Sequence, residues 1–349
     1  MIRLEQIRAK LSDDESLLVS NPVNIRYLSG FTGSNGLLHI SKLTAHLYTD
    51  SRYELQAAKE VSEFEVIISQ DIWHQITKGI SSTVLCIEAK HLTVGKLAGL
   101  KQEMPKLRFK ECSDLIEQLR ISKDSTEIES ITKACEISVE ALRQLTELKL
   151  IGKTELELAT WLERKMIDLG ASDKAFNTIV ASGPNSAIPH HQPTSRQIAV
   201  GDLLKIDFGA DYRGYKSDCT RTFSIGKTQT WQKEIYVAVR DGQLIGRKLV
   251  AANTKISDID AGVRNQIQQS GFGQYFTHGL GHGVGLEIHE DPFLSAKTAD
   301  KITEDMVITV EPGIYLAERG GVRIEDTGVI KSSGYEVLTK FTYELLELA

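Results

Sequence analysis

The first third of the chain alternates short apolar runs with amphipathic stretches of helical length. The apolar runs have the length of strands and lie at residues 16–19, 36–40, 64–68 and 84–87. The stretches with helical spacing lie at residues 51–61, 71–80 and 92–104. Apolar runs that alternate with helical segments predict a small α/β layer with a sheet of its own.

A polar break near residue 122 ends this layer. Asp124 or Ser125 is placed to cap a new helix, whose apolar residues recur near the helical period. We therefore expect two domains, at residues 1–121 and 122–349. Further helices of the second domain are expected near residues 154–169, 231–251 and 256–269.

Two strands on either side of Arg213-Gly214 carry acids within apolar sequence. Arg213-Gly214 suits a two-residue hairpin turn, which would pair Asp207 with Thr220. Asp218 lies two residues from Thr220 and would therefore share the sheet face of Asp207. Diagonal neighbours on one face lie about 7–8 Å apart. Two such carboxylates would repel each other unless a cation lay between them.

A second stretch repeats this design around a polar loop at residues 317–320. Glu311 and Glu325 lie symmetrically about that loop, and Glu311 interrupts an apolar strand. Acids are rarely buried unless they are paired or bind a metal ion, so two hairpins with paired acids indicate one shared site. By contrast, we expect Asp211 and Asp326 to be turn or solvent residues.

A structural alternative explains these acids without a ligand. Asp218 and Glu325 would face water or form ion pairs with Arg221 and Arg323. Exposed pairs of this kind contribute only about 0–1 kcal/mol and need no cation.

Histidines and glycines are concentrated between residue 278 and residue 290. His278 and His282 have the i, i+4 spacing of a helical metal site, but four glycines follow His278 within seven residues. Each glycine would cost about 1 kcal/mol in a helix. We therefore expect extended or irregular backbone that approaches a ligand or another strand closely.

His190 and His191 lie in a loop rich in Gly, Pro and Asn, and loops of this kind often carry functional side chains. On the residues alone His190 is as much a structural as a functional candidate, and His191 is the weaker of the two. The histidines of the first domain have no acidic partners nearby in sequence and are expected to be structural: His39, His46, His74 and His91.

The composition excludes several function classes. The chain has 349 residues, of which 41% are hydrophobic and 25% charged, and a net charge of −6, which argues against a broad nucleic-acid surface. No apolar run approaches the roughly 18 residues of a membrane span, and the first residues lack the apolar stretch of a signal peptide. The four cysteines lack C-x-x-C spacing, which favours plain thiols in a reducing cytoplasm.

The acids and one histidine form a single candidate ligand set: Asp207, Asp218, Glu311, Glu325 and His282. The charge of these carboxylates balances two divalent ions, and oxygen-rich ligands with one imidazole suit Mn²⁺, Co²⁺ or Fe²⁺ without excluding Zn²⁺. Two ions about 3.5–4 Å apart hold a bridging hydroxide and polarise a carbonyl, which is hydrolytic chemistry. The sequence has no G-x-x-x-x-G-K phosphate loop, so nucleotide binding has little support.

These motifs resemble those of the aminopeptidase P/prolidase branch of the "pita-bread" metallopeptidases, over almost the whole chain. The motifs are Ile206-Asp207-Phe208-Gly209, Ser217-Asp218-Cys219-Thr220-Arg221-Thr222, Val310-Glu311-Pro312-Gly313, Val322-Arg323-Ile324-Glu325-Asp326 and the segments at residues 182–190 and 278–290. Residues 28–34 and 49–53 resemble the first domain of aminopeptidase P. The resemblance implies an α+β fold, in which a smaller α/β creatinase-like domain precedes a pita-bread catalytic domain.

The resemblance also implies a role for each candidate ligand. Asp207 would bind one metal ion and His282 the other, while Asp218 and Glu325 would bridge both. Glu311 would bind the second ion and act as the general base.

Outside the ligand set, the resemblance makes His289 the residue that stabilises the tetrahedral intermediate. His278 and His190 would line the substrate site, with His190 near the scissile peptide, and Arg323 would support the metal centre. Thr220 and Thr309 would hold ligands in place.

By this resemblance we expect a Xaa-Pro aminopeptidase that uses two divalent ions per subunit, Mn²⁺ first and Co²⁺, Fe²⁺ or Zn²⁺ as alternatives. It would bind proline-containing peptides, and neither nucleic acid nor a membrane, as a cytoplasmic homodimer or larger oligomer. The alternative is a Xaa-Pro dipeptidase (prolidase), and a more remote one is a non-catalytic binding module on the same fold.

Overall fold

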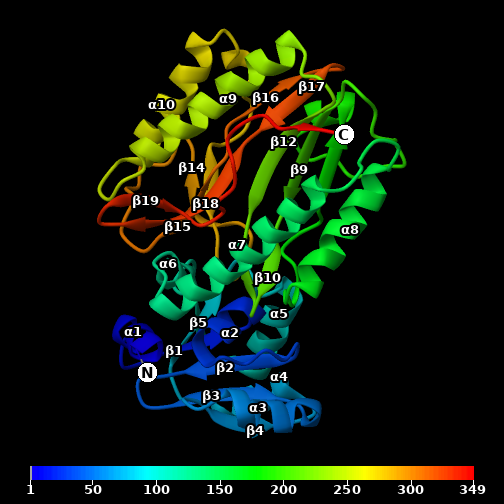
Figure 1. Ribbon diagram of the computed structural model, residues 1–349. Helices are drawn as coiled ribbons and strands as arrows, with labels where there is room; N and C mark the ends of the chain where they lie inside the picture. The colour runs from blue at the N-terminus through cyan, green and yellow to red at the C-terminus, as the bar shows by residue number, and fades with distance from the viewer. Residues whose placement is uncertain (1) are drawn as a thin grey trace. The chain divides into compact units, whose positions relative to one another are not determined.

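The structure is a computed structural model that describes residues 2–349. The chain divides into two compact units, Met1–Arg120 and Ile121–Ala349. Each unit has its own sheet and its own helices, which Figure 1 colours blue to cyan in the first unit and green to red in the second.

The first unit contains a six-stranded mixed sheet in the order β4-β3-β2-β1-β5-β6. Its strands are β1 (Glu15–Val19), β2 (Gly36–Ile40), β3 (Ala45–Thr49), β4 (Glu65–Ile68), β5 (Val84–Glu88) and β6 (Arg108–Cys112). The apolar runs predict β1, β2, β4 and β5 correctly. They miss β3 and β6; in β6 most side chains are exposed, so this edge strand has no apolar run to reveal it.

The helices of the first unit are α1 (Ile2–Lys10), α2 (Pro22–Ser29), α3 (Glu54–Glu60), α4 (Ile72–Gly79), α5 (Val94–Glu103) and α6 (Glu117–Arg120), with a 3₁₀ turn at Ser51–Tyr53. The side chains of Asp71 and Thr93 cap α4 and α5 by accepting backbone N–H bonds. The predicted helices α3, α4 and α5 are therefore confirmed, and the α/β layer with them.

The second unit begins with two long helices whose first turns are fixed by capping boxes. Asp124 and Glu127 cap α7 (Ser125–Thr146), and Thr154 and Glu157 cap α8 (Glu155–Asp168). Two further helices, α9 (Thr230–Leu249) and α10 (Ile256–Gln269), lie where the sequence predicts them. Short 3₁₀ turns lie at Gly183–Ala187 and Gly273–Tyr275.

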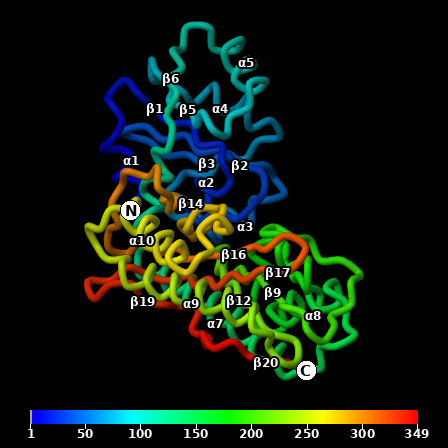
Figure 2. The backbone as a smooth tube through the Cα atoms, turned by 90° about the horizontal axis from the view of Figure 1, so that it is seen from above, coloured from blue at the N-terminus to red at the C-terminus, as the bar shows by residue number. Residues whose placement is uncertain are grey.

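A nine-stranded sheet dominates the second unit, with the order β14-β13-β15-β18-β12-β9-β8, and with β19 paired to β18 and β20 paired to β12. Its strands are β8 (Ile179–Ser182), β9 (Leu203–Phe208), β12 (Cys219–Ile225), β13 (Gly281–Gly283), β14 (Glu290–Leu294), β15 (Val307–Val310), β18 (Glu325–Lys331), β19 (Gly334–Val337) and β20 (Glu347–Leu348). Smaller sheets are formed by β7 (Asp173–Lys174), β10 (Ala210–Tyr212) and β11 (Tyr215–Lys216), and by β16 (Gly313–Leu316) and β17 (Gly320–Arg323). Figure 2 labels β20 beside the C-terminus.

The residue alternation of β9 separates the core from the site. Leu204, Ile206 and Phe208 pack in one hydrophobic cluster with residues of α7 and α8. Because neighbouring side chains of a strand point to opposite faces, Lys205 and Asp207 lie on the other face of the sheet. A second cluster joins α9 and α10 to β15 and β18, and both helix pairs are visible beside the sheet in Figure 1.

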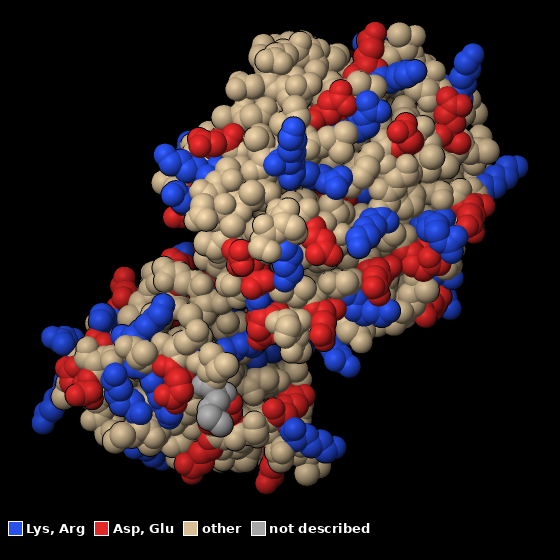
Figure 3. Space-filling view, turned by 60° about the vertical axis from the view of Figure 1, so that its left-hand side comes forward, with Lys and Arg blue, Asp and Glu red and all other residues tan. Residues whose placement is uncertain are grey.

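The described residues include no helix long and apolar enough to cross a membrane. Cys86, Cys135 and Cys219 are buried free thiols and Cys112 is a half-buried one. On the face shown in Figure 3, basic and acidic side chains are interspersed.

The histidine-glycine segment is extended at β13 and irregular after it, as the expected extended or irregular backbone implies. Its strand β13 packs so closely that a Cβ atom added at Gly281 would lie 2.2 Å from the carbonyl oxygen of Thr309. One added at Gly283 would lie 2.4 Å from the carbonyl oxygen of Asp291. These glycines therefore permit close approach to other strands.

We predict that Gly281→Ala lowers the free energy of unfolding by about 1–3 kcal/mol, because the new methyl group would displace the β15 backbone. Gly279→Ala is the matched control, since its Cβ would lie 3.4 Å from the nearest atom, the Leu294 carbonyl oxygen. Denaturant unfolding of both variants in chelator measures the difference. Equal destabilisation by the two substitutions would contradict the close-approach explanation.

Candidate metal centre

The first acid hairpin has the predicted register. Arg213 and Gly214 both have positive φ angles, 52° and 81°, as a type I′ turn requires. Asp207 in β9 pairs with Thr220 in β12, and Thr220 pairs in turn with Glu325 in β18. Two acids are thus held on either side of Thr220, on adjacent strands.

The second acid hairpin is bent into two sheets. Its outer part pairs β15 with β18, and its inner part pairs β16 with β17 around residues 317–319. Glu311 follows the last residue of β15, and Glu325 begins β18. Both acids therefore lie at the bend, where the chain leaves the large sheet.

All four predicted acids meet at one cavity of about 280 Å³ within the second unit. Asp207, Asp218 and Glu325 are buried, with exposed fractions of 8%, 5% and 1%, and Glu311 is partly buried. The cavity is lined by these acids and by Phe176, Ile179, Pro189, His190, His278, Gly279, Gly281, His282, Ile288, His289, Phe293 and Arg323. The structure thus brings every predicted metal, catalytic and substrate residue to one place.

The structural alternative for these acids is wrong, because Asp218 and Glu325 do not face water. Arg323 Nη2 instead donates to Asp207 Oδ2. Arg221 forms its ion pair with Asp326, at 2.7 Å.

Asp326 is a correction to the sequence analysis, which expects a turn or solvent residue. Its carboxylate has no exposed surface and accepts hydrogen bonds from Arg221 Nη2 (2.7 Å), Gln243 Nε2 (2.6 Å) and Tyr343 Oη (2.7 Å). The donors come from β12, α9 and the C-terminal segment, so only the folded chain brings them together. Asp211 has the expected place beside the turn, where it accepts the N–H of Gly214.

His282 presents a lone pair to the acids. Its Nδ1 lies 3.0 Å from the carbonyl oxygen of Gly283, which can only accept, so Nδ1 carries the hydrogen. Burial lowers the pKa of His282 to about 4, which leaves Nε2 unprotonated at neutral pH. Nε2 lies 3.5 Å from Asp218 Oδ2 and 3.5 Å from Glu311 Oε1.

The electrostatics of the acids show how strongly they oppose one another. Burial and the charges of Glu325 and Asp207 raise the pKa of Asp218 well above its ordinary value. Burial and the charges of Glu311 and Asp207 do the same to Glu325. Burial, partly offset by Arg323, raises the pKa of Glu311 to about 8. Without a cation, the site therefore retains protons.

These observations test whether a metal ion fits. Ligand atoms of Asp218, His282 and Glu325 all lie within 4.8 Å of one another. Asp207 Oδ1 is buried and has no hydrogen-bond partner. An acceptor without a donor, beside an imidazole lone pair and further carboxylates, is a donor set suited to divalent cations.

The predicted threonines contact the acids or the histidine. Thr220 Oγ1 donates to Glu325 Oε2 at 2.6 Å and accepts from Arg323 Nε at 3.0 Å. Thr309 Oγ1 accepts the backbone N–H of His282 at 3.0 Å and lies 3.4 Å from Glu311 Oε1. Both threonines thus restrain groups of the site.

Tyr315 is a site residue that the sequence reasoning misses. Its hydroxyl lies 2.9 Å from His278 Nε2 and accepts from Arg323 Nη1 at 2.8 Å. His278 Nδ1 donates to the carbonyl oxygen of Gly279, and burial lowers the pKa of His278 to about 4, so Nε2 accepts the Tyr315 hydrogen. Its position four residues after Glu311 carries no signal by itself.

Lys205 is a second missed residue. It lies two positions before Asp207 with no exposed surface, and its Nζ donates to the carbonyl oxygen of Ile188 at 2.7 Å. Burial lowers the pKa of this amine well below its ordinary value. A lysine inside the apolar strand β9 is the signal that could have drawn attention to it.

The remaining histidines lie at the rim. The rings of His282 and His289 are 4.4 Å apart in an edge-to-face arrangement. His289 and His190 have exposed side chains that line the cavity. Burial and the nearby His190 lower the pKa of His289.

Comparison with known proteins places this site in a family. Residues 129–332 match the model described as "Metallopeptidase family M24", and residues 3–122 match "Creatinase/Prolidase N-terminal domain". The chain is 41% identical to a Xaa-Pro dipeptidase of Pyrococcus horikoshii, over 97% of this chain and 95% of that protein.

Solved structures give the same result. A Xaa-Pro dipeptidase from Bacillus anthracis superposes with a TM-score of 0.97 at 36% identity, covering 100% of this chain and 99% of that one. An X-Pro aminopeptidase from Thermotoga maritima superposes with a TM-score of 0.93 at 35% identity, covering 99% and 100%. These matches confirm the family resemblance and the expected fold, a creatinase-like domain followed by a pita-bread catalytic domain.

We predict that metal binding releases protons and strengthens with pH. Glu311, whose pKa is raised to about 8, holds a proton below that pH, and a metal ion must displace it. The apparent affinity for Mn²⁺ therefore rises with pH through the pKa of Glu311, at about 8. Titration calorimetry at pH 6.5 and pH 9, in buffers of different ionisation enthalpy, measures the protons released. Absence of proton release on Mn²⁺ binding at pH 6.5 would contradict the prediction. The Glu311→Gln variant should release fewer protons on Mn²⁺ binding than the original chain, because it lacks this titrating carboxyl group.

Proposed function

The chain belongs to metallopeptidase family M24, and on that premise we propose that it is a Xaa-Pro dipeptidase which hydrolyses the bond between an N-terminal residue and a following proline. The observation that carries this proposal is the cavity at which four acids and His282 converge. A binding module without catalysis would not need this set of opposed carboxylates.

The relatives support the dipeptidase alternative better than the aminopeptidase that the sequence led us to expect. Proteins named Xaa-Pro dipeptidase from two Pyrococcus species are 41% and 39% identical over nearly the whole chain. The cavity also favours a short substrate, because 280 Å³ lies just below the usual range of ligand pockets, about 300–1,000 Å³.

The residues that would hold two divalent ions are Asp207, Asp218, His282, Glu311 and Glu325. Bound there, the ions would polarise the scissile carbonyl and lower the pKa of a water molecule to near neutrality. We propose Mn²⁺ as the native ion. Asp207 offers its unpartnered Oδ1, while its Oδ2 stays with Arg323.

Glu311 is the proposed general base. It lies at the cavity, beside His282 and within 3.4 Å of Thr309 Oγ1, so its carboxylate has a fixed orientation. It would take a proton from the attacking water and deliver it to the proline nitrogen that leaves.

The rim histidines would bind the substrate around this step. His289 would donate to the oxygen that becomes negative in the tetrahedral intermediate, and His190 would face the scissile peptide from the opposite loop. Burial keeps His278 neutral, and its Nε2 accepts from Tyr315, so this histidine would form an uncharged wall of the site.

A second candidate function is the Xaa-Pro aminopeptidase, which cleaves longer peptides at the same bond. The observation in its favour is the fold match to the Thermotoga maritima X-Pro aminopeptidase.

We further propose a cytoplasmic location, since free buried thiols suit a reducing compartment. The homodimer remains a proposal from the family resemblance.

The substrate proposal predicts selectivity for length. With Mn²⁺, purified protein should hydrolyse Xaa-Pro dipeptides with a kcat/KM at least about tenfold above that for Xaa-Pro-Xaa tripeptides, a difference of about 1.4 kcal/mol. Quantifying the released amino acid by chromatography measures both rates. Equal or faster tripeptide cleavage would establish the aminopeptidase instead, and cleavage of neither substrate would refute both.

The ligand proposal predicts that Asp218→Asn removes metal and activity together. Loss of one carboxylate of the candidate ligand set should lower kcat by at least about 10³-fold and lower the bound metal measured by elemental analysis. Asp211→Asn is the matched control, because this acid lies on the same hairpin with 8% exposure but pairs with Lys216 at 2.5 Å. Full metal occupancy with normal turnover in Asp218→Asn would rule out the assignment.

A further inference from the structure

The loop between β8 and β9 brings a histidine to the cavity without a strand or α-helix to hold it. It runs from residue 183 to residue 202, and its middle part supplies Pro189 and His190 to the cavity lining. The His190 side chain is exposed. Its position therefore depends on how the rest of the loop is anchored.

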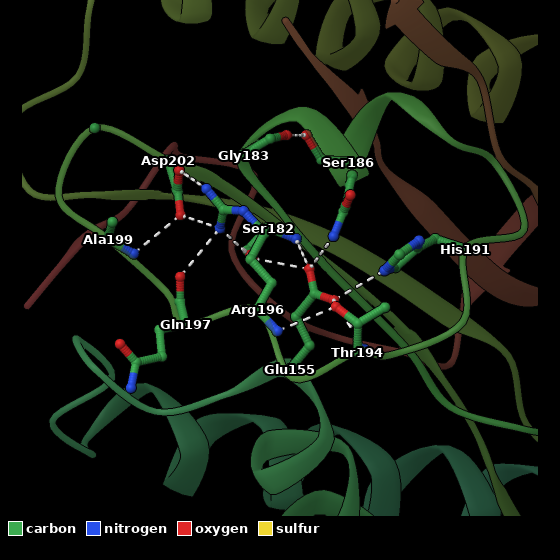
Figure 4. Close-up of polar contacts among 12 residues, drawn as sticks. Glu155, Ser182, Gly183, Ser186, His191, Thr194, Arg196, Gln197, Ala199 and Asp202 are labelled. Atoms are coloured by element: carbon green, nitrogen blue, oxygen red, sulfur yellow. Dashed lines mark hydrogen bonds and ion pairs between the residues drawn. The ribbon is translucent and has the colours of Figure 1, made fainter. Parts of the chain in front are cut away.

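Glu155 anchors both arms of this loop (Figure 4). Its Oε1 accepts from Ser182 N (2.7 Å), Ser182 Oγ (2.8 Å) and Asn185 Nδ2 (3.0 Å). Its Oε2 accepts from His191 Nε2 (2.9 Å), Thr194 N (3.0 Å) and Thr194 Oγ1 (2.7 Å). The first three donors precede His190 in the chain, and the last three follow it.

Glu155 is not explained by the helix that it begins. Thr154 and Glu157 already form the capping box of α8. Glu155 has no exposed surface, and a carboxylate without water needs hydrogen bonds to remain ionised. Burial raises its pKa, but the bonds from His191, Asn185, Ser182 and Thr194 outweigh burial and lower the pKa to about 2. The carboxylate is therefore ionised at neutral pH.

An ion pair holds the distal end of the loop. Arg196 donates to both carboxylate oxygens of Asp202, at 2.6 and 2.9 Å, and its Nη1 also donates to Ser182 Oγ at 2.6 Å. Asp202 accepts the N–H of Ala199 at 2.9 Å. Figure 4 shows this pair next to the Glu155 cluster, so the two ends of the loop share one polar network.

Two buried basic side chains hold the middle of the loop. Lys205 Nζ donates to the carbonyl oxygen of Ile188, and Arg323 Nη1 to that of Pro189 at 3.2 Å. These carbonyls immediately precede His190. The loop is thus held at its arms by a carboxylate and at its middle by two basic side chains.

We propose that Glu155 is a positioning residue of the active site, which holds the arms of the 183–202 loop so that His190 stands at the scissile peptide. The proposal rests on the proposed function for the role of His190. The network itself is independent of that role.

The test substitutes Glu155→Gln, which keeps the shape but places an NH₂ group where only donors converge. Hydrogen exchange measured by mass spectrometry should show faster exchange confined to residues 182–194, with bound Mn²⁺ unchanged. The kcat/KM for a Xaa-Pro dipeptide should fall about 10- to 100-fold, because small misplacements of a reacting group have effects of this size.

Glu127→Gln is the matched control. Glu127 is also a buried acid in the first turn of a helix, but it accepts from Asp124 N and Tyr215 Oη, which lie outside the loop. It should leave exchange in residues 182–194 and kcat/KM within about twofold of the original chain. Faster exchange throughout the second unit in Glu155→Gln would show a general structural role and overturn the proposal.

A double-mutant cycle separates positioning from stability. In a His190→Ala background, Glu155→Gln should lower kcat/KM by less than about threefold, because the group that it positions is already gone. An equal loss in both backgrounds would overturn the proposal. If the original chain hydrolyses no Xaa-Pro peptide, the proposed function fails, while the exchange experiment still decides whether Glu155 orders the loop.

Discussion

The repulsion among four carboxylates in one cavity is the constraint on which the second unit depends. Asp207, Asp218, Glu311 and Glu325 lie together with the guanidinium of Arg323 and the neutral imidazole of His282. Desolvating an unpaired carboxylate costs several kcal/mol, and like charges at close range add to that. The folded chain tolerates them by retaining protons and by pairing Asp207 with Arg323. Two divalent cations would neutralise the carboxylates in place of the retained protons. The repulsion that destabilises the metal-free fold therefore favours metal binding.

The hydrophobic layers supply the stability that offsets this strain. Leu204, Ile206 and Phe208 are fully buried against α7 and α8, and burial of each such side chain contributes about 1.5–3 kcal/mol. The same strand alternation that directs these residues into the core directs Lys205 and Asp207 to the opposite face. The position of an acid in β9 is therefore fixed by its apolar neighbours, and Asp207 cannot leave the cavity without exposing the core.

This local rule explains what the sequence could predict. Register within a hairpin follows from the turn, so Asp207, Thr220 and Asp218 were placed correctly from Arg213-Gly214 alone. The failures depend on contacts between distant segments. Asp326 was misjudged because its donors include Gln243 on α9 and Tyr343 near the C-terminus, and Tyr315 acquires its role only when β16 folds against Arg323. Glu155 has no place in the sequence analysis, since its partners lie 27 to 39 residues away.

A series of polar contacts runs from the 183–202 loop to the cavity. Glu155 faces the loop donors, Lys205 and Arg323 face the loop carbonyls, and Arg323 also faces Asp207. Arg323 therefore belongs to two groups at once, since the same guanidinium holds the carbonyl of Pro189 and balances an acid of the metal set. A cation bound among the acids would take the free Oδ1 of Asp207, so Arg323 would keep both its contact with Oδ2 and its contact with the loop. Glu155 acts on the arms of the loop and the acids act at the cavity, so loosening the arms leaves the candidate metal ligands in place.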